Sequence, residues 1–197
     1  MKLVSIIVDA ELDCSAPDAA RRLLGCELER TLDNGTVMRA RIIETEAYDE
    51  LDPGSHTYRG QTPRNNVMYG KPGFLYVYFI YGMYYCCNIV TGPEGHGEAV
   101  LIRAVEPLAG EDVMKVNRRG NTGKTLTNGP GKLCVAMQID RQLNGHDLRT
   151  GPLRLIMRPS IPDSHITQTT RIGLRQGAET PWRFYITNSE YISKRSK

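Results

Sequence analysis

Residues 26–48, CELERTLDNGTVMRARIIETEAY, carry the pattern that decides the fold. Apolar and polar residues alternate on both sides of Asp33-Asn34-Gly35, as expected of two half-buried strands. Asn-Gly suits a tight antiparallel turn, because both residues readily adopt positive φ. The stretch therefore predicts a β-hairpin. Its second strand starts at Val37 and continues through Ile43 directly into Glu44-Thr45-Glu46-Ala47-Tyr48.

A helix is expected just before this hairpin. Ser15-Ala-Pro-Asp18 supplies a serine N-cap, a proline in the first turn and an acidic group three residues after the serine. The helix AARRLLG should then stop near Gly25. The first fourteen residues are short and partly apolar, and they predict either a strand or a tail.

The rest of the chain predicts more strands than helices. Residues 49–66 are rich in Gly, Pro, Asp and Asn and should form a loop with little regular structure, and a loop of that length is usually functional or disordered. A short helix and a flexible basic stretch are expected in 111–128, and a second helix over 132–139. Strands are expected at 74–81, 84–90, 99–105, 153–157, 170–174 and 182–186. Helices combined with mostly antiparallel strands indicate an α+β fold.

Composition places few limits on function. A chain of 197 residues with 40% hydrophobic content can bury one sizeable core, so residues 1–197 are expected to form a single domain. The net charge of +3 permits nucleic-acid binding without requiring it. The five cysteines show no metal-ligand spacing and are expected to be reduced thiols. No apolar run is long enough to span a bilayer, and no signal peptide is evident.

Three charged residues on or beside apolar strands are the first candidates for chemistry. Alternation places Glu44 and Glu46 on the same face of their strand and Thr45 on the opposite face. Arg103 is the one charge in the apolar run 99–105. Two carboxylates near an arginine suit an acid–base site, and a structural ion pair at a sheet end explains the same pattern. The residues alone leave both interpretations open.

Eight of the ten tyrosines fall in the stretch from Tyr48 to Tyr85. Alternation sends Tyr76 and Tyr78 to one face, and Tyr81 to the other face or into the turn before Gly82. Each buried hydroxyl needs a partner, so tyrosine is costly as a core residue. The cluster suits stacking against planar bases, and a tyrosine-lined sheet edge or subunit interface explains it equally well.

Two polar segments complete the set of candidates. His56 lies in the long loop, where a lone histidine is more often exposed than catalytic. Residues 59–66, including Arg64, are basic and polar. Asn128-Gly-Pro-Gly-Lys132 places backbone N–H groups and a lysine at a helix start. Either segment could hold phosphates, or could be an ordinary solvated loop.

Together these segments resemble the alkyladenine (3-methyladenine) DNA glycosylase family. The resemblance is carried by long, ordered motifs and covers nearly the whole chain. These motifs are Arg41-Ile-Ile-Glu-Thr-Glu-Ala-Tyr48, His56, Gln61-Thr-Pro-Arg-Asn65, the run from Lys71 to Asn88, Ala99–Leu108 and Asn128-Gly-Pro-Gly-Lys-Leu-Cys134. The resemblance implies one curved, mostly antiparallel sheet flanked by helices, like the C-terminal domain of formyltransferases.

The resemblance also implies roles for individual residues. Glu46 would be the base that activates the attacking water, Arg103 would position that water and carboxylate, and His56 would hydrogen-bond near the reacting sugar. The remaining matches line the base pocket or meet the DNA. Tyr48, His56 and Tyr78 would sandwich the flipped base, Asn88 would disfavour the 2-amino group of guanine, and Tyr81 would wedge into the DNA. From their own basic character, Arg64 and Lys132 are expected to contact the DNA backbone.

The implied activity is monofunctional base excision. Such an enzyme flips damaged purines out of duplex DNA and hydrolyses the N-glycosidic bond, leaving an abasic site. The implied substrates are 3-methyladenine, 7-methylguanine, hypoxanthine and ethenoadenine. We expect no metal, no other cofactor, no lyase step, a monomer, and a location in the cytoplasm or nucleoid (or the nucleus). A non-catalytic damage-binding module and a hydrolase of free nucleosides are the competing hypotheses. Residues 49–55, 59–60 and 115–124 depart from the family pattern, so substrate range is open.

Overall fold

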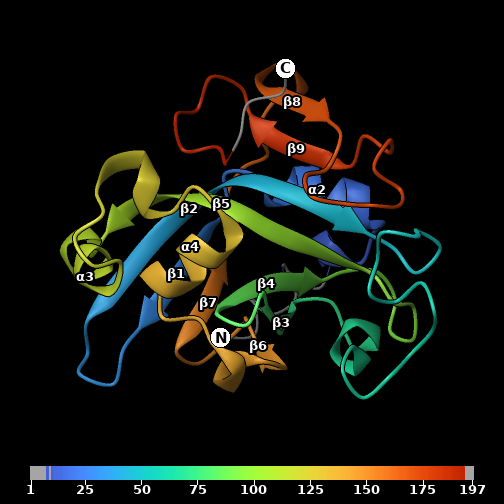
Figure 1. The fold of residues 1–197 in the computed structure, drawn as a ribbon, viewed down its shortest axis with the longest axis horizontal. Helices are drawn as coiled ribbons and strands as arrows, with labels where there is room; N and C mark the ends of the chain where they lie inside the picture. The colour runs from blue at the N-terminus through green and yellow to red at the C-terminus, as the bar shows by residue number, and fades with distance from the viewer. Residues whose placement is uncertain (1–7, 9, 194–197) are drawn as a thin grey trace.

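The computed structural model describes residue 8 and residues 10–193. The expectation of a strand or tail over the first fourteen residues falls largely outside the described residues, but Ala10–Leu12 are helical rather than extended. Within the described residues, every strand pairing is antiparallel. The predicted α+β class is confirmed: one curled antiparallel sheet is accompanied by a few short helices (Figure 1).

The strands form one sheet in the order β6-β3-β4-β5-β2-β1-β7, with β9 on β2 and β8 on β9. Their bounds are β1 Glu27–Thr31, β2 Val37–Tyr48, β3 Phe74–Ile80, β4 Tyr84–Val90, β5 Ala99–Ala109, β6 His146–Asp147, β7 Leu153–Ile156, β8 Ile166–Thr169 and β9 Arg183–Ile186.

The predicted hairpin is confirmed as β1 and β2. Thr31 pairs with Val37, and Gly35 in the turn has a φ of 81°, a conformation that glycine adopts without strain. β2 is the longest strand, and β1 pairs only with its first part, residues 37–41. β9 pairs with residues 44–46 instead, so the C-terminal segment reaches the strand that carries both glutamates (Figure 1).

The helices are short. The α-helices are α2 Ala16–Leu23, α3 Glu111–Asn117 and α4 Pro130–Ala136, and the 3-10 helices are η1 Asn66–Tyr69, η2 Gly123–Leu126, η3 Arg141–Leu143 and η4 Asp163–His165. Ser15 caps α2 as predicted, with its hydroxyl oxygen accepting from the N–H of Asp18. α2 packs on β2, while α4 packs on β4 and β5. None of the described helices is long and apolar enough to cross a membrane.

Several predicted boundaries were wrong. The helix expected over 132–139 is α4, which begins at Pro130 and ends at Ala136. The strand expected at 170–174 does not form; the extended segment is β8, Ile166–Thr169. Gly173 in the irregular segment has a φ of 82°, which is incompatible with a regular strand.

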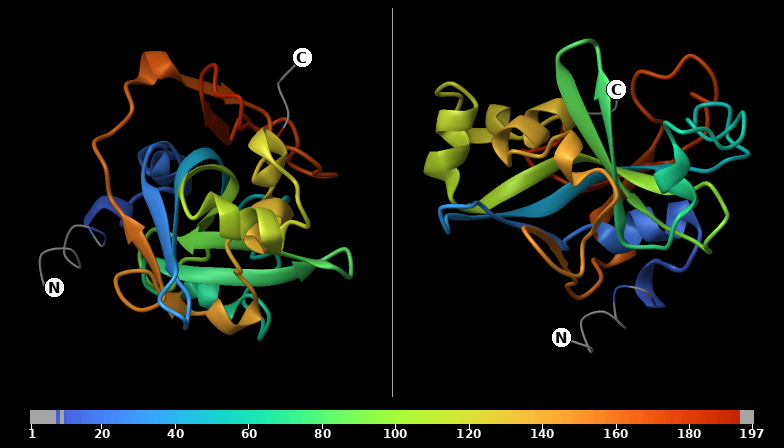
Figure 2. Two further views of the ribbon diagram at one scale, coloured as in Figure 1. Left: turned by 90° about the vertical axis from the view of Figure 1, so that its left-hand side faces the viewer. Right: turned by 90° about the horizontal axis from the view of Figure 1, so that it is seen from below.

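The β3–β4 hairpin extends beyond the body of the molecule, as the two further views show (Figure 2). Its inner residues are buried and its tip is exposed, because the last residues of β3 and the first of β4 have no other strand beside them. The hairpin therefore combines a buried base with a projecting, solvent-exposed end.

Candidate active site

The buried carboxylate of Glu46 is the centre of the site. Its side chain is fully buried and accepts three hydrogen bonds. Arg103 Nη1 donates to Oε2 at 3.0 Å, the Tyr48 hydroxyl donates to Oε2 at 2.9 Å, and the Ile172 N–H donates to Oε1 at 2.7 Å. Charge-assisted bonds of this kind are what a buried carboxylate requires.

Glu44 lies on the same face of β2, as alternation predicted. Thr45 points to the opposite face, where its hydroxyl donates to the carbonyl of Ala20 in α2. The Glu44 carboxylate accepts from Arg183 Nε at 2.6 Å and from the Ser193 N–H at 2.6 Å. Protein groups therefore surround Glu44, which points to a supporting role rather than a chemical one.

Arg103 joins the two glutamates. Its Nη1 contacts Glu46, and its Nε lies 3.6 Å from Glu44 Oε1. Burial lowers the pKa of Arg103, but the charges of Glu46 and Glu44 outweigh that effect, so the pKa rises. Arg103 is therefore a permanent cation between two carboxylates, and the ion pair suggested by the sequence is present.

An aromatic cavity adjoins the carboxylate. It has a volume of about 90 Å³ and is lined by Tyr48, Gly54, His56, Met68, Tyr78, Asn88 and Leu174. The predicted tyrosine face is confirmed, since the Tyr76 and Tyr78 rings stack with centroids 5.3 Å apart. The His56 ring meets the Tyr78 ring edge-on at 4.6 Å. The cavity thus has aromatic walls, and His56 and Asn88 are among its polar groups.

His56 is exposed on one side, as expected for a loop histidine, yet its ring is held in place. Nδ1 lies 3.1 Å from the Tyr76 hydroxyl. Burial against the tyrosines and the charge of Arg64 lower the pKa of His56, so the ring is neutral at neutral pH. Burial followed by the charge of Glu46 raises the pKa of Tyr48, which keeps its hydroxyl a donor.

Asn88 lies deep in the cavity and is 4% exposed. Its Oδ1 is buried and has no hydrogen-bond partner among the described residues. An unsatisfied polar atom is costly in a protein interior, and this one lies at the cavity.

A groove of about 740 Å³ leads from this site to the surface. It shares Tyr48, His56, Tyr78 and Leu174 with the small cavity. Residues from distant parts of the chain line it, including Arg64, Tyr81, Arg103, Arg118, Lys132 and Ile172. Tyr81 lies at the tip of the β3–β4 hairpin, is 84% exposed, and has a φ of 52°. Lys132 Nζ donates to Asn128 Oδ1 at 2.7 Å.

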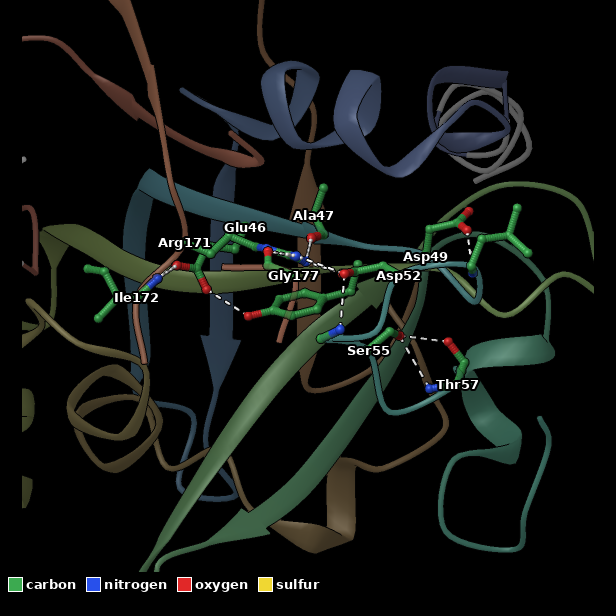
Figure 3. A network of polar contacts seen from close by, with 12 residues as sticks. Glu46, Ala47, Asp49, Asp52, Ser55, Thr57, Arg171, Ile172 and Gly177 are labelled. Atoms are coloured by element: carbon green, nitrogen blue, oxygen red, sulfur yellow. Dashed lines mark hydrogen bonds and ion pairs between the residues drawn. The ribbon is translucent and has the colours of Figure 1, made fainter. Parts of the chain in front are cut away.

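Sequence reasoning missed the 170–178 loop. Ile172 donates to Glu46, Leu174 lines the cavity, and Arg171 is bound to Asp52 in the 49–65 loop (Figure 3). Arg171 could have indicated this loop, because it is a charged residue within residues 170–174, the segment that was expected to be a strand. Its partner lies 119 residues away, so no local pattern could reveal the pairing.

Among the described residues, one cluster has side chains that could hold a metal ion. Asp49, His96 and Glu98 bring their donor atoms within 4.8 Å of one another, away from the groove and the cavity. Hydrogen bonding to Asp49 raises the pKa of His96, with further contributions from nearby charges. The cluster is thus accounted for as an ion pair with Nε2 2.8 Å from Asp49 Oδ2. The expectation of no metal stays a prediction.

Comparison with known proteins identifies the class. Residues 10–190 match the family model described as methylpurine-DNA glycosylase (MPG). This fold and this match define a DNA glycosylase, a hydrolase of N-glycosyl bonds that removes alkylated purines in DNA repair. The chain belongs to the methylpurine-DNA glycosylase family, which confirms the resemblance seen in the sequence.

Relatives from bacteria and archaea align along most of their length. A protein of Carboxydothermus hydrogenoformans is 49% identical over 89% of this chain and 92% of its own, and one of Methanoculleus marisnigri is 47% identical over 89% and 92%. A third, from Trichodesmium erythraeum, is 42% identical over 96% and 98%. Each bears the name "Putative 3-methyladenine DNA glycosylase".

Proposed function

We propose that this protein flips 3-methyladenine and related damaged purines out of duplex DNA and hydrolyses their N-glycosidic bond with a water activated by Glu46. The related purines are 7-methylguanine, hypoxanthine and ethenoadenine. The observation that carries the proposal is that the buried Glu46 carboxylate is hydrogen-bonded to residues of the groove wall. All three of its hydrogen-bond donors, Tyr48, Arg103 and Ile172, line the groove.

The flipped base would occupy the aromatic cavity. Tyr48, Tyr78 and His56 offer ring faces and edges to a planar base, and stacking contributes roughly 1–3 kcal/mol per base. Flipping costs a few kcal/mol and least for a damaged or weakly paired base, so lesions enter more readily. Alkylation at N3 or N7 makes the purine cationic, and tyrosine ring faces attract cations.

Hydrolysis would then proceed by general base catalysis. As the N-glycosidic bond breaks, its electron pair leaves with the purine and the sugar acquires oxocarbenium character. Glu46 takes a proton from water while the water oxygen bonds to the sugar carbon, giving an abasic site and the free base. Arg103 holds the carboxylate and orients the water. A cationic purine leaves as a neutral molecule, whereas hypoxanthine needs a proton as well.

The DNA would lie across the groove opening. Tyr81, exposed at the hairpin tip, would fill the gap left by the flipped base, and Arg64 and Lys132 at the groove wall would contact phosphates. We further propose that one copy of the chain acts alone, since the carboxylate, cavity and groove all come from one chain.

A lesion panel tests the proposal. Duplexes that each carry one damaged purine are incubated with excess enzyme, and free base and abasic sites are measured, with the matching free nucleosides assayed in parallel. We expect release from at least one alkylated duplex and none from nucleosides. Release from nucleosides alone, or tight binding to lesion DNA with no release, would instead support one of the two competing functions.

A further inference from the structure

We propose that Asp52 and Arg171 form a clasp that positions both Glu46 and Tyr48, so that Asp52 and Arg171 are positioning residues of the glycosylase reaction. The inference rests on the proposed function of Glu46. It concerns two residues that touch neither the cavity nor the groove, since neither residue lines them.

The clasp is a buried, bidentate ion pair. Arg171 Nη2 donates to Asp52 Oδ1 at 2.9 Å, and Nη1 donates to Oδ2. The same guanidinium donates to the carbonyls of Ala47 at 3.0 Å and Gly177 at 2.7 Å (Figure 3). Both side chains are almost fully buried. Because the planar guanidinium donates to four acceptor oxygens, the orientation of the Arg171 side chain is fixed.

This orientation is transmitted to both oxygens of Glu46. The residue after Arg171 is Ile172, whose N–H donates to Oε1 of Glu46. The guanidinium carbon of Arg171 lies 4.8 Å from the centroid of the Tyr48 ring, and the Tyr48 hydroxyl donates to Oε2. Among the described residues, two of the three donors to Glu46 are thus held by one arginine, and the third, Arg103, is independent of it.

The clasp also joins the two loops that supply cavity walls. Gly54 and His56 come from the 49–65 loop, and Leu174 comes from the 170–178 loop. Asp52 Oδ1 accepts from the Gly54 N–H at 3.0 Å as well as from Arg171. The ion pair therefore ties the loop that supplies Gly54 and His56 to the loop that supplies Leu174.

Gly177 shows how closely the clasp is packed. Its φ is 62°, and an added Cβ would lie 2.5 Å from Asp52 Oδ1 and 3.1 Å from Arg171 Nη2. Real Cβ atoms do not approach other atoms so closely. The Gly177 carbonyl can therefore accept from Arg171 in this arrangement only because residue 177 is glycine. Arg171 Nε is buried without a hydrogen-bond partner among the described residues. An unsatisfied buried donor costs free energy, and the other contacts of Arg171 must offset that cost.

A second bidentate pair provides a control. Arg158 Nε and Nη2 donate to Glu27 Oε1 and Oε2 at 2.9 and 3.0 Å, and Glu27 is buried. That pair joins β1 to the end of β7 and does not contact Glu46, the cavity or the groove. Arg158 is 44% exposed, so this pair is less buried than the clasp. Glu27→Gln therefore removes a bidentate ion pair that has no proposed positioning role.

The experiment compares Asp52→Asn, Arg171→Lys and Glu27→Gln with the unchanged enzyme. Single-turnover base release is measured on an alkylated duplex. Affinity is measured on a duplex with a stable abasic analogue, because an abasic site has no base to contact the cavity walls. Hydrogen exchange of the Ile172 amide is followed by NMR, with the Ile42 amide in β2 as internal reference. Asp52→Glu tests whether restoring the carboxylate restores the rate.

We expect Asp52→Asn to slow base release by about tenfold or more with little change in affinity, since small misplacements of catalytic groups have effects of this size. The Ile172 amide should lose protection while the Ile42 amide keeps it. Arg171→Lys should behave similarly, Asp52→Glu should recover part of the rate, and Glu27→Gln should leave rate and Ile172 exchange unchanged.

The positioning role of Asp52 and Arg171 would be contradicted by either of two results. One is an equal rate loss in Asp52→Asn and Glu27→Gln, and the other is unchanged protection of the Ile172 amide in Asp52→Asn and Arg171→Lys. The exchange measurement needs no activity. If the unchanged enzyme released no base from any lesion, the proposed function would fail, and Ile172 exchange would still decide whether the clasp positions the loop.

Discussion

Arg103 Nη1 lies 3.0 Å from Oε2 of Glu46, while Arg103 Nε faces Glu44 at 3.6 Å. The two glutamates differ in what else surrounds them. Glu44 is enclosed by Arg183 and the Ser193 backbone, and Glu46 is held by residues that line the open groove. One arginine therefore connects a structural carboxylate to the carboxylate proposed to activate water.

Replacing Glu44 with glutamine should destabilise the fold. The change removes the buried negative charge opposite Arg183 and Arg103, and breaking a buried ion pair costs about 3–5 kcal/mol. Urea unfolding of Glu44→Gln measures the loss. Glu106→Gln, which breaks the half-exposed pair with Arg41, serves as control and should cost about 1 kcal/mol or less. Equal losses in the two variants would show that burial of Glu44 does not matter.

Tyr81→Ala should weaken activity on duplex DNA more than on single strands. Tyr81 is 84% exposed at the hairpin tip, so its loss removes no core packing. A wedge is needed only where a base leaves a stack, and stacking is worth roughly 1–3 kcal/mol, or on the order of tenfold and more in rate. Single-turnover rates on matched duplex and single-stranded substrates measure the effect. An equal decrease on both substrates would remove the wedge role.

Asn88→Ser should relax discrimination against undamaged guanine. The Asn88 side chain is buried at the cavity wall, and a smaller side chain makes room for an exocyclic amino group. Removing a steric barrier of this size changes selectivity by roughly tenfold or more. Release of guanine from undamaged duplex, relative to release of an alkylated base, is the readout. Unchanged selectivity would refute this role of Asn88.

His96 should give a pH-dependent contribution to stability. Hydrogen bonding to Asp49 raises the pKa of His96 above its ordinary value of 6.5, so the folded state binds a proton more tightly than the unfolded state. This stabilisation is fully present below pH 6.5 and is lost as the pH rises through the folded pKa. The Tm difference between the unchanged protein and His96→Asn should therefore shrink from pH 6 to pH 9. A constant difference would contradict the ion pair.

Local sequence patterns predicted the parts of this protein that depend on local chemistry. The Asn34-Gly35 turn, the shared face of Glu44 and Glu46, and the stacked Tyr76 and Tyr78 follow from turn preference and strand alternation. These elements place the carboxylates and the aromatic wall with no information from the rest of the chain.

The parts that sequence could not predict depend on long-range pairing. Residues 170–174 resemble a strand, but Arg171 turns inward to Asp52 and carries Ile172 to Glu46. The roles of Asn88 and Tyr81 came from family resemblance, because a single asparagine or an exposed tyrosine has no distinctive local pattern. The structure places both beside the cavity or the groove, which makes their roles testable.

The most direct test of the central claim is single-turnover base release by Glu46→Gln on an alkylated duplex. Glutamine keeps the shape of the side chain but cannot take a proton from water, so release should fall below detection. Binding to the same lesion duplex should stay close to that of the unchanged enzyme. Release at the normal rate by a folded Glu46→Gln variant would show that Glu46 is not the base.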